Sequence, residues 1–202
     1  GTGFYEFTGL TPGTYSVEFE TPNGFEPSPA NEGGDDTVDS DADEVTGETP
    51  QVTLASGENN PTLDAGFYEL AALGDFVFED EDGDGVQDPG EDGVPNLTVY
   101  LKDENGVIID TTVTDVNGLY SFTELIPGTY SVQFELPDGF VFSPLDQGGN
   151  EATDSDADPN MNGMTDPVTL TSGETNNDLD AGIIKDCDVA ISINPSAPIC
   201  PG

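Results

Sequence analysis

The sequence predicts an all-β protein built from tandem β-sandwich domains of the immunoglobulin-like or transthyretin-like type. Apolar and polar residues alternate in short runs, which is the period of a half-buried strand. Gly, Pro, Asn or Asp bounds each run, and no helical period lasts long enough to compete. The chain also contains an internal repeat about as long as one small β domain. Short strands with alternating faces, repeated in this way, are typical of sandwiches.

The internal repeat defines the domain organisation. Residues 1–43 align with residues 116–158 without a gap, and 25 of these 43 positions are identical. Leu63–Gly66 recurs as Leu179–Gly182 after a one-residue shift. We therefore expect a partial repeat whose first strands are missing or supplied by a neighbour, then a complete repeat, then a strand and linker into a next module or subunit. These segments cover residues 1–70, 73–184 and 185–202.

The strands of the complete repeat follow from its alternating runs. Phe76–Phe78, Leu97–Lys102 and Tyr130–Glu135 each place apolar side chains on one face. Asn105-Gly106 and Asn117-Gly118 are typical of tight hairpin turns. The residues expected in the core are Val99, Leu101, Phe122, Tyr130, Val132 and Phe134.

Composition excludes several classes of function. The chain has 42 acidic residues against two lysines, Lys102 and Lys185, and its formal net charge is -40. Such a polyanion cannot bind the phosphates of nucleic acid or of an anionic membrane. No apolar run approaches the ~18 residues needed to span a bilayer, so we expect no membrane insertion. Without His, catalytic triads and His-bound zinc are unavailable, and the carboxylates lie in Gly- and Ser-rich runs rather than apolar clefts; we expect no enzyme.

Residues 80–91 have the ligand spacing of an EF-hand calcium loop. Carboxylates stand at positions 1, 3, 5, 9 and 12, with Gly at position 6. Alternate side chains turn inward, Gly permits the bend, and position 7 offers its carbonyl oxygen to a cation that prefers six to eight hard oxygens. The flanks read as strand and loop rather than helix. The alternative is a solvated acidic turn that binds nothing. The expected ligands are Asp80, Asp82, Asp84, Val86, Asp88 and Glu91.

A second acidic motif occurs in both repeats. Alternation sends three carboxylates to one side of the chain, and Mg²⁺ accepts such multi-carboxylate cages less readily than Ca²⁺. Asp115, Glu151 or Asp166 could complete the shell in the second copy. A flexible acidic loop without a cation is the alternative. The expected ligands are Asp154, Asp156 and Asp158, and in the first copy Asp39, Asp41 and Asp43.

Two smaller features could carry covalent modifications. Asn96-Leu97-Thr98 is an N-glycosylation sequon, which makes Asn96 a glycosylation candidate. Cys187 and Cys200 are the only cysteines; they could bridge each other in an oxidising compartment or pair outside this sequence.

Taken together, the motifs resemble the B-repeat domains of serine-aspartate repeat surface adhesins, in the collagen-adhesin B-type group. The resemblance covers residues 73–184 throughout and residues 1–70 in part. It implies a calcium-loaded β-sandwich strung in tandem as a stiff stalk, with one calcium site on Asp80, Asp82, Asp84, Asp88 and Glu91 and another on Asp154 and Asp156. The motifs are Gly74–Phe78, the 80–91 loop, Gly93–Pro95, Thr114–Phe122, Pro127–Tyr130, Asp154–Asp156 and Leu179–Gly182.

We therefore expect a calcium-stabilised structural module of an extracellular bacterial stalk, adhesin or filament, located at the cell surface or secreted. Its expected partners are neighbouring repeats or identical subunits. Head-to-tail polymerisation could occur if a strand such as Val189–Ile193 completes the first repeat of the next subunit. The alternative is an adhesive module that itself binds a host protein or a surface glycan.

Overall fold

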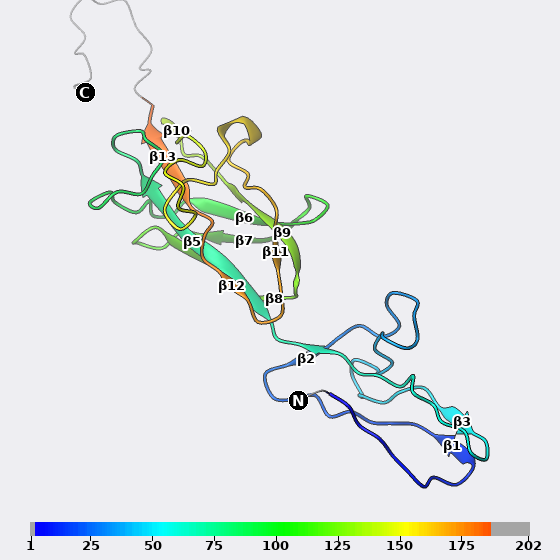
Figure 1. The fold of residues 1–202 in the computed structure, drawn as a ribbon. Helices are drawn as coiled ribbons and strands as arrows, with labels where there is room; N and C mark the ends of the chain where they lie inside the picture. The colour runs from blue at the N-terminus through cyan, green and yellow to red at the C-terminus, as the bar shows by residue number, and fades with distance from the viewer. Residues whose placement is uncertain (1–2, 187–202) are drawn as a thin grey trace, which may run out of the picture. The chain divides into compact units, whose positions relative to one another are not determined.

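The computed structural model describes residues 3–186 and divides the chain into two compact units, with the boundary between Glu69 and Leu70 (Figure 1). Strands and loops make up the described residues, apart from one 3-10 turn, η1 (Pro159–Met161). The predicted all-β fold is thereby confirmed. No helix in the described part of the chain is long and apolar enough to cross a membrane.

The second unit contains two β-sheets. In the first sheet, β13 pairs with β5 in parallel, while β8 and β5 are antiparallel. All pairs of the second sheet are antiparallel. The first sheet has the order β10 (Phe140–Phe142), β13 (Ala181–Lys185), β5 (Ala71–Glu79) and β12 (Thr175–Asn176), with β8 (Leu119–Leu125) also paired to β5. The second has the order β11 (Val168–Leu170), β9 (Gly128–Phe134), β6 (Thr98–Asp103) and β7 (Ile108–Val113).

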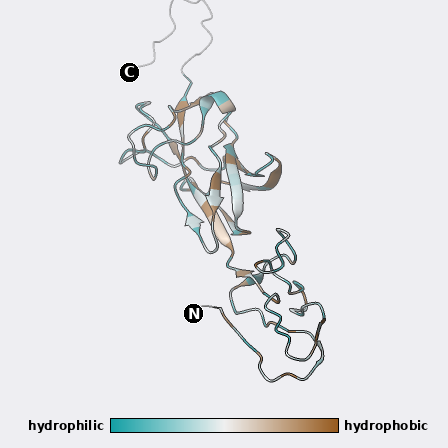
Figure 2. Cartoon of the chain, turned by 45° about the vertical axis from the view of Figure 1, so that its right-hand side comes forward, coloured by the Kyte–Doolittle hydropathy of each residue, from teal (hydrophilic) through white to brown (hydrophobic). Residues whose placement is uncertain are grey.

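The inward faces of these strands form the core of the second unit. Residues two apart are buried in each of β6 (Val99 and Leu101), β8 (Tyr120 and Phe122) and β9 (Val132 and Phe134), because successive side chains of a strand point to opposite faces. The Tyr120 ring meets the rings of Phe122 and Phe134 edge-on, with centroids 6.1 and 5.5 Å apart. Figure 2 shows hydrophobic residues along the strands of this unit. Of the predicted core, Val99, Leu101, Phe122, Val132 and Phe134 are buried, and Tyr130 is partly buried.

The first unit keeps only part of this pattern. Its strands pair antiparallel as β1 with β3 and β2 with β4. The first pair corresponds to β9 with β11 in the second unit, and the second to β10 with β13. The strands are β1 (Gly13–Tyr15), β2 (Glu26–Pro27), β3 (Val52–Leu54) and β4 (Phe67–Tyr68).

The predicted disulfide and the predicted donor strand lie beyond β13. Cys187, Cys200 and Val189–Ile193 are outside the described residues. The last described strand ends at Lys185, whose ammonium group forms an ion pair with Glu79 of β5.

Candidate metal centres

The 80–91 loop brings three of its five predicted carboxylates together. Oxygens of Asp80, Asp82 and Asp84 all lie within 4.8 Å of one another. Asp80 is buried at the end of β5, and its Oδ1 and Oδ2 accept hydrogen bonds from the backbone N–H groups of Gly83 (2.6 Å) and Gly85 (3.0 Å). These bonds hold the first carboxylate in place while the next two stay solvent-exposed.

Gly85, at position 6, is required by the loop's geometry. Its φ is +83°, a backbone conformation that residues with a Cβ adopt at a cost. A Cβ there would also lie 2.4 Å from the Pro144 carbonyl oxygen. Glycine at position 6 is therefore expected both from the ligand spacing of a calcium loop and from the packing of this loop.

Glu91 closes the other end of the loop. Its two carboxylate oxygens accept hydrogen bonds from the N–H groups of Glu81 (2.8 Å) and Asp88 (2.9 Å). Asp88 and Glu91 lie outside the three-carboxylate group, and Val86 donates its N–H to Asp84 Oδ1 (2.9 Å). The structure thus folds the twelve residues into one closed loop, with the cluster at its first half.

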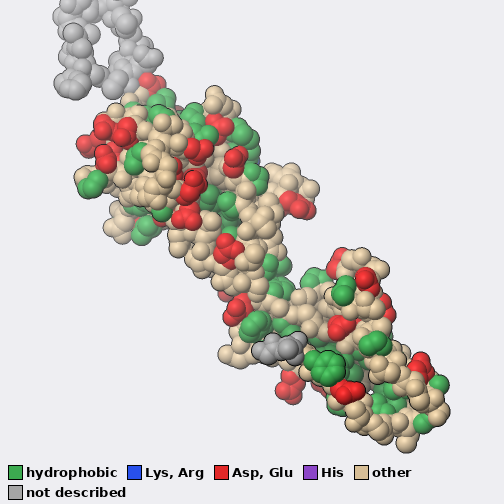
Figure 3. All heavy atoms as spheres, in the orientation of Figure 1, with side chains coloured by type: hydrophobic (Ala, Val, Ile, Leu, Met, Phe, Trp, Pro, Cys, Tyr) green, Lys and Arg blue, Asp and Glu red, His purple; other side chains and the backbone are tan. Residues whose placement is uncertain are grey.

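The second acidic motif lies directly against the 80–91 loop. Ser155 donates its N–H to the Gly85 carbonyl oxygen (3.0 Å), and Gln87 donates to the Thr153 carbonyl oxygen (2.7 Å). Val86 and Asp154 form an isolated antiparallel bridge. Segments about seventy residues apart in sequence therefore share one acidic region, and Figure 3 shows Asp and Glu side chains gathered on the second unit.

Within this second motif the three aspartates separate. Asp154 is buried, and its Oδ1 has no hydrogen-bond partner among the described residues. Asp156 accepts a hydrogen bond on Oδ2 from the N–H of Asp180 (2.7 Å). Asp158 instead accepts from the N–H of Asn160 (2.7 Å) and caps η1. The structure therefore does not bring Asp158 to its predicted partners.

Among the residues proposed to complete the shell, Asp115 is used elsewhere. Its Oδ1 accepts hydrogen bonds from the N–H groups of Asn117 and Leu119, and these bonds lower the pKa of Asp115. Glu151 is near enough to raise the pKa of Asp156 through its negative charge, although burial is the larger cause of that rise. Asp166 accepts a hydrogen bond on its backbone carbonyl oxygen from Thr165 Oγ1 (3.1 Å).

Asp180 and Asp75 join this region although the motifs did not indicate them. Asp180 is buried just before β13, and neither of its carboxylate oxygens makes a hydrogen bond of good geometry within the described residues. Burial raises its pKa to about 8, the negative charges of Asp75 and Asp156 add to the rise, and the N–H of Phe76 opposes it. Burial likewise raises the pKa of Asp156 to about 7 and that of Asp75 to about 6.

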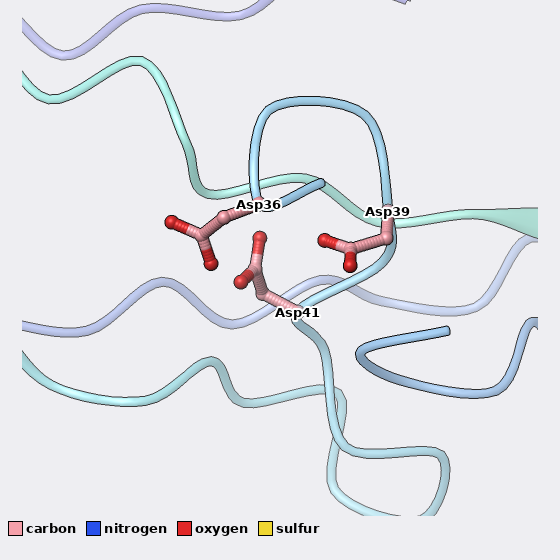
Figure 4. Close-up of side chains that lie close together, drawn as sticks. All are labelled: Asp36, Asp39 and Asp41. Carbon is pink, nitrogen blue, oxygen red and sulfur yellow. The ribbon is translucent and has the colours of Figure 1, made fainter. Parts of the chain in front are cut away.

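The first unit has a related cluster of different membership. Oxygens of Asp36, Asp39 and Asp41 lie within 4.8 Å of one another, and Figure 4 shows the Asp41 carboxylate between those of Asp36 and Asp39. Asp41 Oδ2 accepts from the N–H of Asp64 (2.7 Å), as Asp156 does from Asp180. Sequence reasoning included Asp39 and Asp41 but missed Asp36.

Asp43, the third predicted ligand of that copy, has a turn-forming role. Its Oδ1 accepts hydrogen bonds from the N–H groups of Thr46 (2.8 Å) and Val45 (3.0 Å). These bonds lower the pKa of Asp43, and the bond from Thr46 has the larger effect. In both repeats the third aspartate thus serves the backbone of the following turn.

The donors in these centres fit a hard divalent cation. All are oxygens, several are buried, and Asp154 Oδ1 and both carboxylate oxygens of Asp180 have no hydrogen-bond partner among the described residues. Burying an unpaired carboxylate is costly, so a proton or a cation must neutralise it. Flexible all-oxygen sites with several carboxylates suit Ca²⁺ better than Mg²⁺.

The glycosylation candidate lies two residues before β6. Asn96 is exposed, has a φ of +59° and donates its N–H to the Thr114 carbonyl oxygen (3.0 Å). Its modification stays a prediction.

Fold, repeat and acidic loops together define the chain as a β-sandwich repeat protein. The SdrD B-like domain family matches residues 1–67 and again residues 71–183. The chain therefore belongs to the SdrD B-like domain family, and the resemblance noted from its motifs is confirmed. This is a family of structural modules of bacterial surface proteins rather than of enzymes, in agreement with the prediction that the chain is not an enzyme.

Curated relatives are much longer than this chain. Serine-aspartate repeat-containing protein D of Staphylococcus aureus strain Newman is 41% identical over 184 residues, which are 91% of this chain and 13% of the relative. Serine-aspartate repeat-containing protein F of Staphylococcus epidermidis strain ATCC 12228 is 43% identical over 159 residues, 78% of this chain and 9% of the relative. The chain thus spans only about an eighth or less of these proteins.

Solved structures show more distant likenesses. The Bacillus anthracis TIE protein matches with a TM-score of 0.40 and 16% identity, over 87% of this chain and 26% of that one. GBS52, the minor pilin of Streptococcus agalactiae, matches with a TM-score of 0.38 and 14% identity, over 96% of this chain and 89% of that one.

Proposed function

We propose that this chain is a calcium-stabilised repeat module that gives rigidity and spacing to an extracellular bacterial stalk, adhesin or filament. The observation that carries this proposal is the buried, unpartnered carboxylate of Asp180 beside Asp75, Asp156 and Asp154. A folded protein retains such groups where something neutralises them. Within this chain, basic side chains cannot do so.

The two lysines are engaged elsewhere. Lys185 pairs with Glu79, and the Lys102 ammonium contacts the Met164 sulfur (3.9 Å). The remaining acidic side chains of a chain with net charge -40 repel one another. Cations from the extracellular medium are the available source of positive charge.

In this proposal the cations act as links between segments distant in sequence. Asp80 directly follows β5, Asp154 and Asp156 lie in the second acidic loop, and Asp180 precedes β13. Cations held by these carboxylates would tie both loops to the central strands. Because they bind the folded state more tightly, each site would add about 3–4 kcal/mol when Ca²⁺ exceeds its dissociation constant a few hundred-fold.

The direct test is thermal unfolding of the full chain in CaCl₂ and in excess chelator. Calcium should raise the Tm by several degrees or more, and titration calorimetry should detect binding. Asp82→Asn should weaken that binding, whereas Glu104→Gln, an exposed acid in the β6–β7 turn, should leave it unchanged. Melting curves that coincide with and without chelator would remove the basis for the proposal.

Neighbouring repeats are the proposed partners, and an extracellular surface the proposed location. The alternative of an adhesive module for a host protein or glycan stays a prediction. The exposed aromatic rings of Tyr5 and Phe7 do not favour it, since their counterparts in the second unit, Tyr120 and Phe122, are buried.

A further inference from the structure

Asn-Gly dipeptides occur at four places in the chain: Asn23-Gly24, Asn105-Gly106, Asn117-Gly118 and Asn162-Gly163. This dipeptide is chemically labile, because glycine has no side chain to keep its backbone nitrogen away from the side-chain amide of the preceding asparagine. Whether that nitrogen reacts in a folded protein depends on its hydrogen bond and on its exposure. The four dipeptides of this chain differ in both respects.

At three of the dipeptides the glycine N–H donates the hydrogen bond that closes a turn. The acceptors are backbone carbonyl oxygens, of Asp103 for Gly106 (2.9 Å), of Asp115 for Gly118 (3.1 Å) and of Asp158 for Gly163 (2.9 Å). Gly118 and Gly163 are also buried. Each of these nitrogens must therefore give up a hydrogen bond before it can react, and two of them must also leave a buried position.

Asn23-Gly24 stands at a different position in its turn. The bond that closes this turn runs from the Phe25 N–H to the Pro22 carbonyl oxygen (3.1 Å), so Gly24 is the third residue of the turn and is not its donor. The Gly24 φ of +88° agrees with that position. Both residues are exposed, and neither the Asn23 amide nor the Gly24 N–H has a hydrogen-bond partner among the described residues. This glycine nitrogen is therefore free to react.

The complete repeat has the same turn, so this geometry belongs to the repeat rather than to the first unit alone. In the second unit the Phe140 N–H donates to the Pro137 carbonyl oxygen (3.2 Å), and Gly139 has a φ of +83°. Asp138 stands there in the place of Asn23. Conversion of Asn23 to aspartate would therefore give the first turn the same four residues as the second.

We propose that Asn23 is a site of spontaneous deamidation and that it converts faster than the asparagines of the other three dipeptides. The Gly24 nitrogen loses its proton to a solvent base and attacks Cγ of Asn23. The bond from Cγ to Nδ2 then breaks, and ammonia leaves with a proton taken from water. Water opens the resulting succinimide ring at either carbonyl carbon. Attack at Cγ gives aspartate, and attack at the backbone carbon gives isoaspartate.

The two products have different consequences for the turn. Aspartate adds one negative charge and keeps the backbone, and the second repeat accommodates it at Asp138. Isoaspartate directs the main chain through the side-chain carbon, which displaces the Phe25 N–H from its acceptor. β2 begins at the next residue, Glu26, and pairs with β4, so this product loosens that pairing as the protein ages. The proposal goes beyond calcium binding and does not depend on it.

The test follows all four dipeptides in one sample of the full chain, kept folded in mildly alkaline buffer with CaCl₂. Peptide mapping by mass spectrometry detects the mass gained when an amide becomes a carboxylate, and fragmentation distinguishes aspartate from isoaspartate. A second sample in concentrated urea gives the rates that local sequence alone determines. Two variants serve as matched controls. Asp138→Asn brings an Asn-Gly dipeptide into the same turn of the second repeat, and Asn23→Gln keeps the amide but closes the ring far more slowly.

In the folded chain we expect Asn23 to deamidate about 10-fold or more faster than the other three asparagines, because only they must first break a hydrogen bond of the glycine. In urea the four rates should be similar. Asp138→Asn should deamidate at its new site about as fast as Asn23, and Asn23→Gln should leave position 23 intact. Equal rates in the folded chain would overturn the proposal. So would the same ratio of rates in urea, or an Asp138→Asn site that stays intact while Asn23 converts.

Discussion

Replacing Asp180 with Asn should change stability in opposite directions with and without calcium. In chelator at pH 8, the wild-type carboxyl must be partly ionised in a buried place where both oxygens lack good partners. Asn has nearly the same shape and no charge, so Asp180→Asn should stabilise the calcium-free protein. In excess calcium the variant loses a proposed ligand, so it should be less stable than wild type.

The magnitude follows from the pKa of Asp180. A rise from an ordinary value of about 4 to about 8 corresponds to at most about 5 kcal/mol at pH 8, at 1.36 kcal/mol for each factor of ten. Asp75 and Asp156 carry part of the same repulsion, so the gain in chelator should be on the order of 2 kcal/mol. In calcium, loss of one carboxylate should weaken binding by about 10-fold or more, equivalent to at least 1.4 kcal/mol.

Urea unfolding followed by tyrosine fluorescence measures both conditions, because the chain has six Tyr and no Trp. Glu104→Gln removes one charge far from the centres and serves as the control. Equal destabilisation of Asp180→Asn in calcium and in chelator would refute the reasoning, since the carboxyl would then act as a packing group and its charge would not matter.

Three further predictions concern the pH dependence of stability, the geometry of the 80–91 loop, and the burial of equivalent residues in the two repeats. Burial raises the pKa values of Asp156 and Asp180 in the folded state, so their protonation stabilises the fold. In chelator this stabilisation is fully present below about pH 4 and is lost as pH rises to 8. The free energy of unfolding should therefore fall over that window, and calcium should flatten the fall. Gly85→Ala should cost about 1–3 kcal/mol and weaken calcium binding, whereas Gly106→Ala, also at positive φ but with no atom near its Cβ, should cost about 1 kcal/mol and leave binding unchanged; urea unfolding and calorimetry distinguish them. Phe122→Ala should cost about 3–5 kcal/mol and Phe7→Ala less than 1, because only Phe122 is buried; similar losses for both would show that burial does not set the cost.

Much of the fold could be predicted because its signals are local. Alternation identified β6 and β9, Asn105-Gly106 identified the turn between β6 and β7, and the repeat placed equivalent strands in both units. The carboxylates at positions 1, 3 and 5 of the 80–91 loop are likewise brought together by a regular local spacing and by Gly85. Short-range patterns of this kind determine the local backbone geometry without contacts from distant segments.

The parts of the candidate sites that the sequence did not predict depend on contacts between distant segments, or on a hydrogen bond to a residue a little further along the chain. Asp75 and Asp180 read as ordinary residues at strand positions, and only the pairing of β5 with β13 brings them together. Alternation predicted that Asp158 would lie with Asp154 and Asp156, but Asn160 offers its N–H and draws the Asp158 carboxylate into a cap. Local hydrogen bonding to a turn thus overrides the side-chain alternation of an extended chain.

The parallel pairing of β5 with β13 determines how the second unit would carry tension. β5 begins this unit at Ala71 and β13 is its last described strand, ending at Lys185. A pull on the two ends would slide these neighbouring strands past each other, because Ala181 pairs with Val77 and Ile183 with Glu79 in the same direction. Hydrogen bonds between parallel strands then lie across the direction of pull and share the load, so they must break together. In a hairpin pulled open from its ends, by contrast, the bonds break one after another.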